Sequence, residues 1–191
     1  MIDRLKLQAR IGIEPVGQAL ARTGISPNVL TTVGCLLNFG VAAVIALGYL
    51  HVGGFLILVA GAFDMLDGAL ARAAKRTTTF GAFLDSTLDR YSEAAIFLGV
   101  FVEAALRQDL QVQLLTYAAA IGSLMVSYAR ARAEGLGLRS SVGLLQRPER
   151  VILLGVGLIF GLEVYALWVL AVLTNVTALH RILHVRRLTE N

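Results

Sequence analysis

The chain has 191 residues, of which 57% are hydrophobic and only 16% charged, with a formal net charge of +4. This composition is too apolar for a soluble domain, and the length fits one domain, so residues 1–191 are expected to form a single membrane-embedded domain. No soluble basic face or aromatic platform accompanies the positive charge, so nucleic acid is not expected as a partner. The single cysteine, Cys35, excludes an intramolecular disulfide.

The N-terminal region predicts a helix on the membrane surface followed by a first span. Residues 2–22 place apolar side chains three and four apart, with basic residues elsewhere, which is typical of an amphipathic interfacial helix in contact with membrane lipid. Ser26 and Pro27 are suited to begin a helix. The uncharged run 29–50 that follows is long enough to cross the membrane. Asn28 and Thr31 stand at its entry, where they are suited to polar capping of the helix.

Five further spans are expected along the chain. A tight turn at His51, Gly53 and Gly54 should precede a second span at 55–74, and the third and fourth spans fit 80–106 and 110–129. The last apolar block, 151–179, is too long for one span and is divided at 161–163. A fifth span then begins near residue 148 and a sixth ends near residue 183. The fold class is therefore all-α integral membrane, with six transmembrane helices in 29–185 preceded by the interfacial helix.

The basic residues predict the orientation of these spans. Fifteen of them would lie on the side that holds both termini, while Arg107 alone lies on the other. Because cytoplasmic loops carry the excess of Lys and Arg, both termini and the loop near residue 76 are expected in the cytoplasm, in a multi-pass protein of the plasma membrane.

Four carboxylates lie inside this apolar framework, in the second and third spans. Asp64 and Asp67 are spaced i, i+3, while Asp85 and Asp89 are spaced i, i+4, so each pair projects from one helix face. A short loop makes the two helices antiparallel neighbours, which brings all four aspartates together. Hard divalent ions, Mg²⁺ or Mn²⁺ and two in number, would neutralise such a cluster. Interhelical salt bridges or a proton path are the alternatives.

The spacing of this segment resembles a known signature. Residues 64–89 read D-x2-D-G-x2-A-R-x8-G-x3-D-x3-D, which is similar to the motif of the CDP-alcohol phosphotransferases. The resemblance implies a CDP-linked lipid as donor, a homodimer, and Asp89 as general base with Asp64, Asp67 and Asp85 as principal metal ligands. The residues expected to bind the CDP-lipid are Asn28, Thr31, Asp64, Asp67, Gly68, Ala71, Arg72, Gly81 and Asp85.

The segment between the fourth and fifth spans suggests the acceptor. It carries five arginines on the membrane side of the carboxylates, and arginine's fork of donors is well matched to phosphate. The runs SYARARAE and RPER resemble the phosphatidylinositol-phosphate synthase branch of the same family. By that resemblance, the acceptor is inositol phosphate, and its phosphate is held by Arg130, Arg132, Arg147 and Arg150. Alternatively, each arginine serves only to orient the spans as a cytoplasmic positive charge. Glu93, Glu134 and Glu149 are candidate salt-bridge partners of these arginines.

The expected function is therefore transfer of a phosphatidyl-type group from a CDP-linked lipid to inositol phosphate, with release of CMP. Glycerol phosphate as the acceptor is the closest alternative. A divalent-cation transporter would also place carboxylates in the membrane, but it would need neither small residues at fixed offsets nor arginines beside the cation path.

Overall fold

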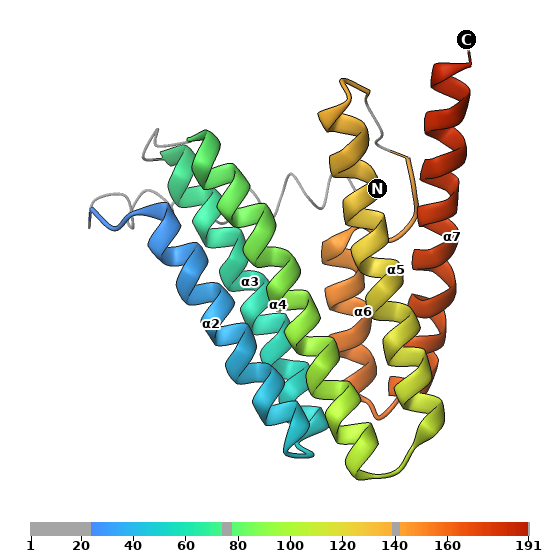
Figure 1. Ribbon diagram of the computed structural model, residues 1–191. Coiled ribbons are helices and arrows are strands. Elements are labelled where there is room, and N and C mark those ends of the chain that lie inside the picture. The colour runs from blue at the N-terminus through green and yellow to red at the C-terminus, as the bar shows by residue number, and fades with distance from the viewer. Residues whose placement is uncertain (1–23, 74–77, 139–141, 191) are drawn as a thin grey trace.

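The structure, a computed structural model, describes residues 24–73, 78–138 and 142–190, except for the side chains at 65, 67–69 and 71–73. Within these ranges the chain forms only α-helices and turns, which confirms the predicted all-α class (Figure 1). The predicted interfacial helix at 2–22 lies outside the described residues. The helices are α2 (Pro27–Ala46), α3 (Leu50–Ala73), α4 (Thr79–Leu106), α5 (Leu110–Gly135), α6 (Arg147–Ile159) and α7 (Glu163–Thr189).

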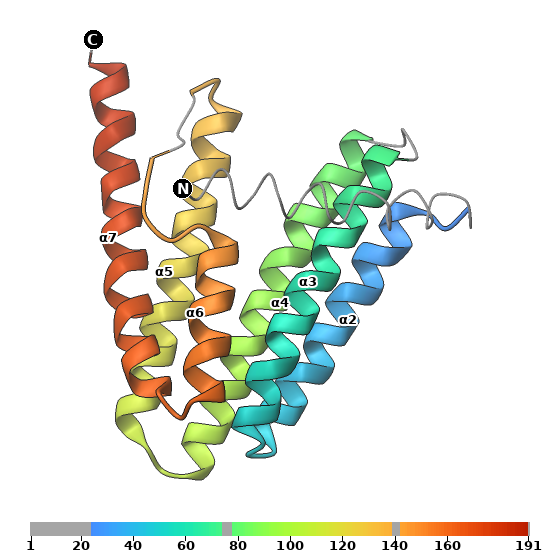
Figure 2. The same cartoon turned by 180° about the vertical axis from the view of Figure 1, so that it is seen from behind.

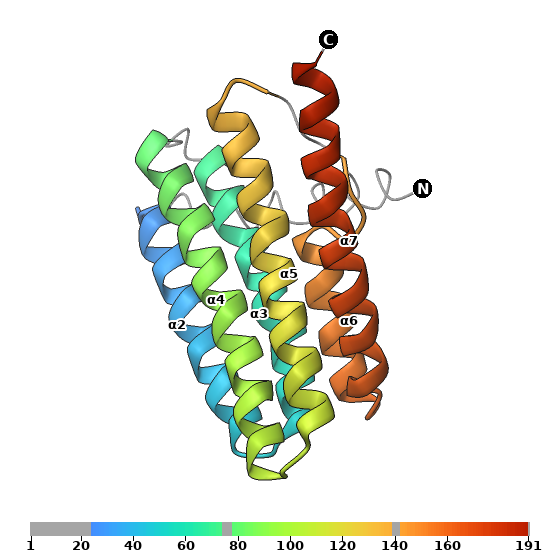
Figure 3. The same ribbon diagram turned by 45° about the vertical axis from the view of Figure 1, so that its right-hand side comes forward.

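The helices form one elongated bundle. In Figure 1, α2, α3 and α4 make one half and α5, α6 and α7 the other, and the view from behind in Figure 2 shows α3 beside α6. Within the described residues, α2 packs on α3 and α4, α5 packs on α7, and α3–α6 and α4–α5 contacts join the halves. Helix α6 is short and begins about halfway along the bundle (Figure 3). Its first residues are therefore placed inside the bundle rather than at its end.

The outer surface of the bundle is apolar. Large hydrophobic side chains such as Leu36, Phe55, Leu98 and Trp168 are half exposed or more, while the core contains fully buried residues such as Ile45. By length and apolar character, the described helices α2, α5 and α7 are able to cross a membrane, and 50–64 is a shorter apolar helical segment. An apolar exterior around an apolar core is what a lipid environment requires. The protein is therefore a membrane protein.

Glycines set the closest approaches between helices. A Cβ on Gly99 of α4 would lie 2.5 Å from the Ala42 carbonyl oxygen of α2, and one on Gly54 of α3 would lie 2.6 Å from that of Gly155 in α6. In a membrane the hydrophobic effect does not drive helices together, so they associate by close van der Waals packing. Small residues of this kind allow that packing because they let the backbones approach.

The turn predicted at His51, Gly53 and Gly54 is wrong. The chain turns earlier, at Gly48, whose φ of 92° suits glycine, and α3 has already begun at Leu50. The two glycines are helical because they serve packing: Gly53 faces the Ile45 side chain and Gly54 faces α6. The Nδ1 atom of His51 lies 3.0 Å from the Ile159 carbonyl oxygen, at the C-terminal end of α6.

The division of the last apolar block is confirmed. Helix α6 ends at Ile159, Gly161 adopts a φ of 65°, and α7 begins at Glu163. The predicted start of the first helix at Ser26 and Pro27 is also confirmed, with Ser26 as the N-cap residue and Pro27 in the first turn.

Candidate active site

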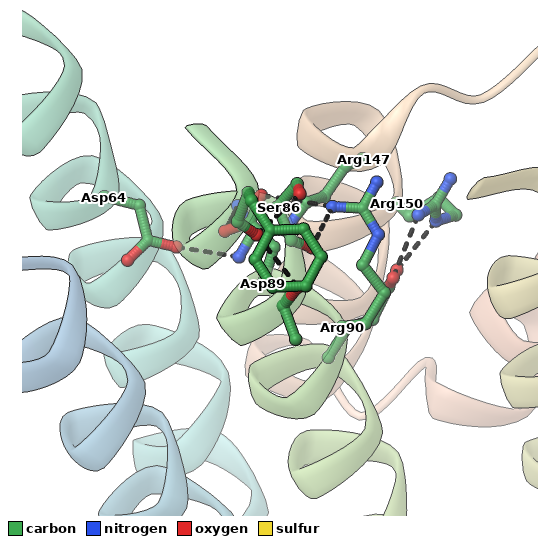
Figure 4. A network of polar contacts seen from close by, with 9 residues as sticks. Asp64, Ser86, Asp89, Arg90, Arg147 and Arg150 are labelled. Carbon is green, nitrogen blue, oxygen red and sulfur yellow. Dashed lines mark hydrogen bonds and ion pairs between the residues drawn. The ribbon is translucent and has the colours of Figure 1, made fainter. Parts of the chain in front are cut away.

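Arg147 joins two of the predicted aspartates. Its Nη2 donates to Asp64 Oδ2 at 2.8 Å, and its Nη1 lies 2.7 Å from Asp89 Oδ1. Figure 4 shows this guanidinium between the two carboxylates, which come from α3 and α4, respectively. The three side chains are only about one-fifth to one-quarter exposed: 24% for Arg147 and 19% for each aspartate. Sequence analysis assigned these residues to different groups, and the structure brings them together.

A second, deeper ion pair lies one helical turn away. Arg150 donates from Nε and Nη2 to the two carboxylate oxygens of Glu93, at 2.7 and 2.9 Å, and from Nη1 to the Leu145 carbonyl oxygen. Both side chains are buried, at 2% and 8% exposed. The expectation that Glu93 pairs with an arginine is therefore confirmed. This two-pronged pair fixes α6 against α4.

Asp85 and Arg90 complete the described part of the carboxylate cluster. Asp85 lies one turn before Asp89 on α4, half-buried and within electrostatic range of Asp64 and Arg147. Arg90 donates to the Ser86 carbonyl oxygen at 2.6 Å, and its Nη1 is 3.6 Å from Asp89 Oδ2. The second oxygen of Asp89 is therefore only weakly engaged.

Several predicted site residues lie outside the described side chains. They are Asp67, Gly68, Ala71 and Arg72 of α3. Among the side chains that are described, no three carboxylate, histidine or cysteine groups are placed to hold a metal ion by themselves.

Glycines also shape the space around the carboxylates. A Cβ on Gly34 of α2 would lie 3.0 Å from Asp64 Oδ1, and one on Gly81 of α4 would lie 3.0 Å from Asn28 Oδ1. Asn28 thus faces Gly81 from α2, and the expected approach of a ligand to Gly81 stays a prediction. Thr31 donates to the Pro27 carbonyl oxygen. Gly34 was missed by sequence analysis because it lies in an uncharged run with no motif around it.

A small cavity of about 20 Å³ lies beneath the ion pairs. Its lining combines apolar residues of α3, α4 and α6 with Asn38, Asp64, Glu93, Arg147 and Arg150. Its volume suits about one water molecule. Substrates of nucleotide size must therefore approach the carboxylates from elsewhere.

Three arginines lie close together on α5, α6 and α7. Arg181 of α7 is only 4% exposed and donates to the carbonyl oxygens of Val142 and Val126. Arg130 and Arg150 are near enough to act on its charge. Within the described chain Arg181 forms no direct ion pair, and Glu134 of α5 is the carboxylate that acts on its charge. Arg181 is one of the fifteen basic residues expected on the side of the termini, and only the fold reveals its burial.

The other two predicted acceptor arginines on α5 are exposed. Arg130 pairs with Glu134, Nε to Oε1 at 2.8 Å, which confirms the expected partnership. Arg132 lies in the last turn of α5. Glu149 instead accepts from the Gln146 backbone N–H at the start of α6, as part of a capping box.

The comparison with known proteins identifies the family. The family model for CDP-alcohol phosphatidyltransferases matches residues 24–179. The chain belongs to this family. Group transfer explains the aspartate motif better than cation transport does. The motif also fixes Gly68, Ala71, Arg72 and Gly81, and a cation path would not need these residues.

Similar members carry related names. An archaetidylinositol phosphate synthase of Pyrococcus horikoshii is 34% identical over 191 residues, covering 100% of this chain and 99% of the relative. A phosphatidylinositol phosphate synthase of Mycobacteroides abscessus is 40% identical over 183 residues, covering 90% and 82%, respectively.

Solved structures of the phosphatidylinositol phosphate synthase PgsA1 of Mycobacterium tuberculosis share the fold. The form with CDP-DAG bound superimposes with a TM-score of 0.85 at 33% identity and covers 91% of this chain and 92% of that one. A form in complex with manganese and citrate gives the same TM-score and identity.

By the chemistry of their donor atoms, the aspartates of this chain suit a divalent ion, although the described ones are not placed to hold it by themselves. Asp64, Asp85 and Asp89 offer hard carboxylate oxygens from two helices, and Gly34 leaves space beside Asp64 Oδ1 that a Cβ would fill. Asp67, one turn from Asp64 in α3, would add the fourth ligand expected from the sequence.

The buried pair predicts unequal effects of two glutamate substitutions. Glu93→Gln leaves the Arg150 charge buried without its counter-ion, so the free energy of unfolding should fall by about 3–5 kcal/mol. Glu134→Gln removes the partner of exposed Arg130 and should cost about 1 kcal/mol or less.

Thermal and denaturant unfolding of the detergent-solubilised variants measures both effects. The double variant Glu93→Gln/Arg150→Gln should recover part of the loss because it removes the unpaired charge. Equal, small losses at Glu93 and Glu134 would show that the buried pair does not hold α4 to α6.

Proposed function

We propose that this protein transfers a phosphatidyl-type group from a CDP-linked lipid to inositol phosphate and releases CMP. The observation that carries the proposal is the placement of buried arginines, Arg150 and Arg181, in the same bundle as the aspartate cluster. The aspartates suit the diphosphate of the donor and the arginines suit a phosphorylated acceptor. The names of the relatives, and the CDP-DAG bound to one of them, support the same assignment.

The proposed metal site consists of Asp64, Asp67, Asp85 and Asp89 with Mg²⁺ or Mn²⁺, two ions in number. Divalent ions there would clamp the donor diphosphate and neutralise the charge of departing CMP. Manganese in the relative PgsA1 supports a metal of this class. The cytidine side of the donor is assigned to the start of α2, to the second half of α3 and to Gly81, that is, to Asn28, Thr31, Gly68, Ala71, Arg72 and Gly81.

Asp89 is the proposed general base. The acceptor hydroxyl oxygen forms a bond to the lipid-side phosphorus, the bond from that phosphorus to the bridging oxygen breaks, and CMP leaves with the electron pair. The hydroxyl proton passes to Asp89. Its Oδ2 is suited to accept it, because Oδ1 is held by Arg147 while Arg90 is 3.6 Å from Oδ2.

The acceptor phosphate is assigned to Arg150 and Arg181, which are buried on α6 and α7, together with Arg130 and Arg132 of α5. Arg181 is fixed by the Val142 carbonyl oxygen, and Arg150 by Glu93 and the Leu145 carbonyl oxygen, so Arg150 has to exchange one of these contacts to donate to the phosphate. Arg130 and Arg132 on α5 would close the pocket from the exposed side. Arg147, assigned to this phosphate from sequence, contacts the carboxylates instead.

The proposed membrane placement follows the charge distribution. Six spans with both termini in the cytoplasm put the aspartates and the arginines within reach of a water-soluble acceptor, while the lipid donor enters from the bilayer of the plasma membrane. A homodimer is proposed from the family resemblance. Crosslinking in native membranes and protease access to the two termini test these assignments.

A turnover assay with an acceptor panel tests the function. The purified protein in CDP-diacylglycerol micelles should release CMP with inositol phosphate, more slowly with glycerol phosphate, and hardly with unphosphorylated inositol. Chelation should abolish turnover and added Mg²⁺ or Mn²⁺ should restore it. Faster use of glycerol phosphate, or full turnover in excess chelator, would contradict the proposal.

The base assignment predicts the behaviour of Asp89→Asn. Asparagine keeps the shape but cannot take the acceptor proton, so kcat should fall by about 10²-fold or more. CDP-lipid binding, measured with labelled donor, should weaken less than it does in Asp64→Asn. Near-normal kcat in Asp89→Asn would remove this residue from the role of base.

The acceptor pocket predicts a selective defect in Arg181→Gln. Loss of a charge-assisted hydrogen bond should raise the KM for inositol phosphate about ten- to a hundredfold and leave the KM for CDP-lipid nearly unchanged. Arg186→Gln is the matched control, since Arg186 lies on the same helix and pairs with Glu190 at its exposed end. Equal rises in both constants for Arg181→Gln would indicate a general structural role.

A further inference from the structure

We propose that Arg147 is a positioning residue of the metal centre, which sets the separation of Asp64 and Asp89, and does not bind the acceptor phosphate. The inference rests on the proposed metal site. It departs from the sequence resemblance, which grouped Arg147 with the acceptor arginines.

The Arg147 guanidinium contacts both aspartates at the same time. Arg147 uses a different terminal nitrogen for each carboxylate, Nη2 for Asp64 at 2.8 Å and Nη1 for Asp89 at 2.7 Å, so both contacts exist at once. A planar guanidinium holds its two nitrogens at a fixed spacing, and therefore it holds two carboxylates at a fixed spacing too. Its Nε is buried without a hydrogen-bond partner. The fork is thus directed to the aspartates.

The two aspartates lie on helices with largely different neighbours. Within the described residues, α3 packs chiefly on α2 and α6, whereas α4 packs chiefly on α2 and α5. The α3–α4 spacing at the depth of the carboxylates is therefore not set by an extensive direct interface. Arg147, from α6, supplies a link between them (Figure 4).

Arg147 itself is also held in place. It is the first residue of α6, where Pro148 and the capping box of Gln146 and Glu149 fix the backbone. One turn later, Arg150 is locked to Glu93 of α4. These contacts within the protein therefore fix the position of Arg147 relative to α4 without a bound ligand.

The contacts leave one oxygen of each aspartate for other partners. Asp64 Oδ1 faces Gly34, where only the absence of a Cβ leaves space, and Asp89 Oδ2 is 3.6 Å from Arg90. Partners that orient the ligands of a metal in this way typically change metal affinity by about 10–100-fold when removed. An arginine that merely competed with the metal would have the opposite effect, because its removal would free two carboxylates.

The test is the affinity for Mn²⁺, measured by the electron paramagnetic resonance signal of the free ion, in protein without donor or acceptor. Arg147→Gln should weaken Mn²⁺ binding by about 10–100-fold. Arg147→Lys keeps the charge but cannot bridge both carboxylates, so it should also bind Mn²⁺ more weakly than the wild type. Arg186→Gln, which removes an exposed arginine of the same cytoplasm-facing set, should bind as the wild type does.

A second readout separates this role from acceptor binding. At saturating Mn²⁺, the KM of Arg147→Gln for inositol phosphate should stay within about twofold of wild type, while kcat falls. Unchanged or tighter Mn²⁺ binding in Arg147→Gln would overturn the proposal, as would a selective rise in that KM. If Arg147→Gln does not fold, wild-type Mn²⁺ affinity in Arg147→Lys overturns it alone. The Mn²⁺ affinity is measured without acceptor, so it tests the role of Arg147 even if the acceptor is not inositol phosphate.

Discussion

The structure depends on neutralising carboxylates inside an apolar bundle. Asp64 and Asp89 share Arg147, and Glu93 is paired at both oxygens with Arg150. Removing one partner from either group would destabilise the protein, since an unpaired buried charge costs several kcal/mol of folding free energy. The same pairs link helices that otherwise pack on different neighbours, so charge compensation and site assembly are achieved by the same side chains.

The short helix α6 makes this arrangement possible. Because α6 begins partway along the bundle, its first turn brings Arg147 and Arg150 to the depth of the aspartates (Figure 3). Residues 142–146, which precede it, are held by α7: Arg181 donates to the Val142 carbonyl oxygen, and Thr177 donates to that of Leu144. Residues 142–146 and the first turn of α6 thus connect the proposed metal site to the proposed acceptor pocket.

Much of this could be predicted from sequence, because local spacing fixes helix faces. The start at Pro27 and the break near Gly161 are local signals, and each is found where predicted, while the metal-binding role of the aspartate motif stays a prediction. The turn at Gly48 was misplaced because Gly53 and Gly54 have the composition of a turn, and only the neighbouring helix shows that they serve packing. The partners of Arg147 and Arg150 lie 83 and 57 residues away, and the burial of Arg181 depends on three helices, so no local pattern could reveal them.

A crystal structure of the protein with Mn²⁺ and a CDP-linked lipid, with anomalous data at the manganese edge, tests the account most directly. It should place manganese among the oxygens of Asp64, Asp67, Asp85 and Asp89, with the donor diphosphate against the metal. Arg147 should still contact Asp64 and Asp89, and Arg150 should still contact Glu93. Manganese bound away from these aspartates, or Arg147 turned from them toward the acceptor pocket, would contradict it.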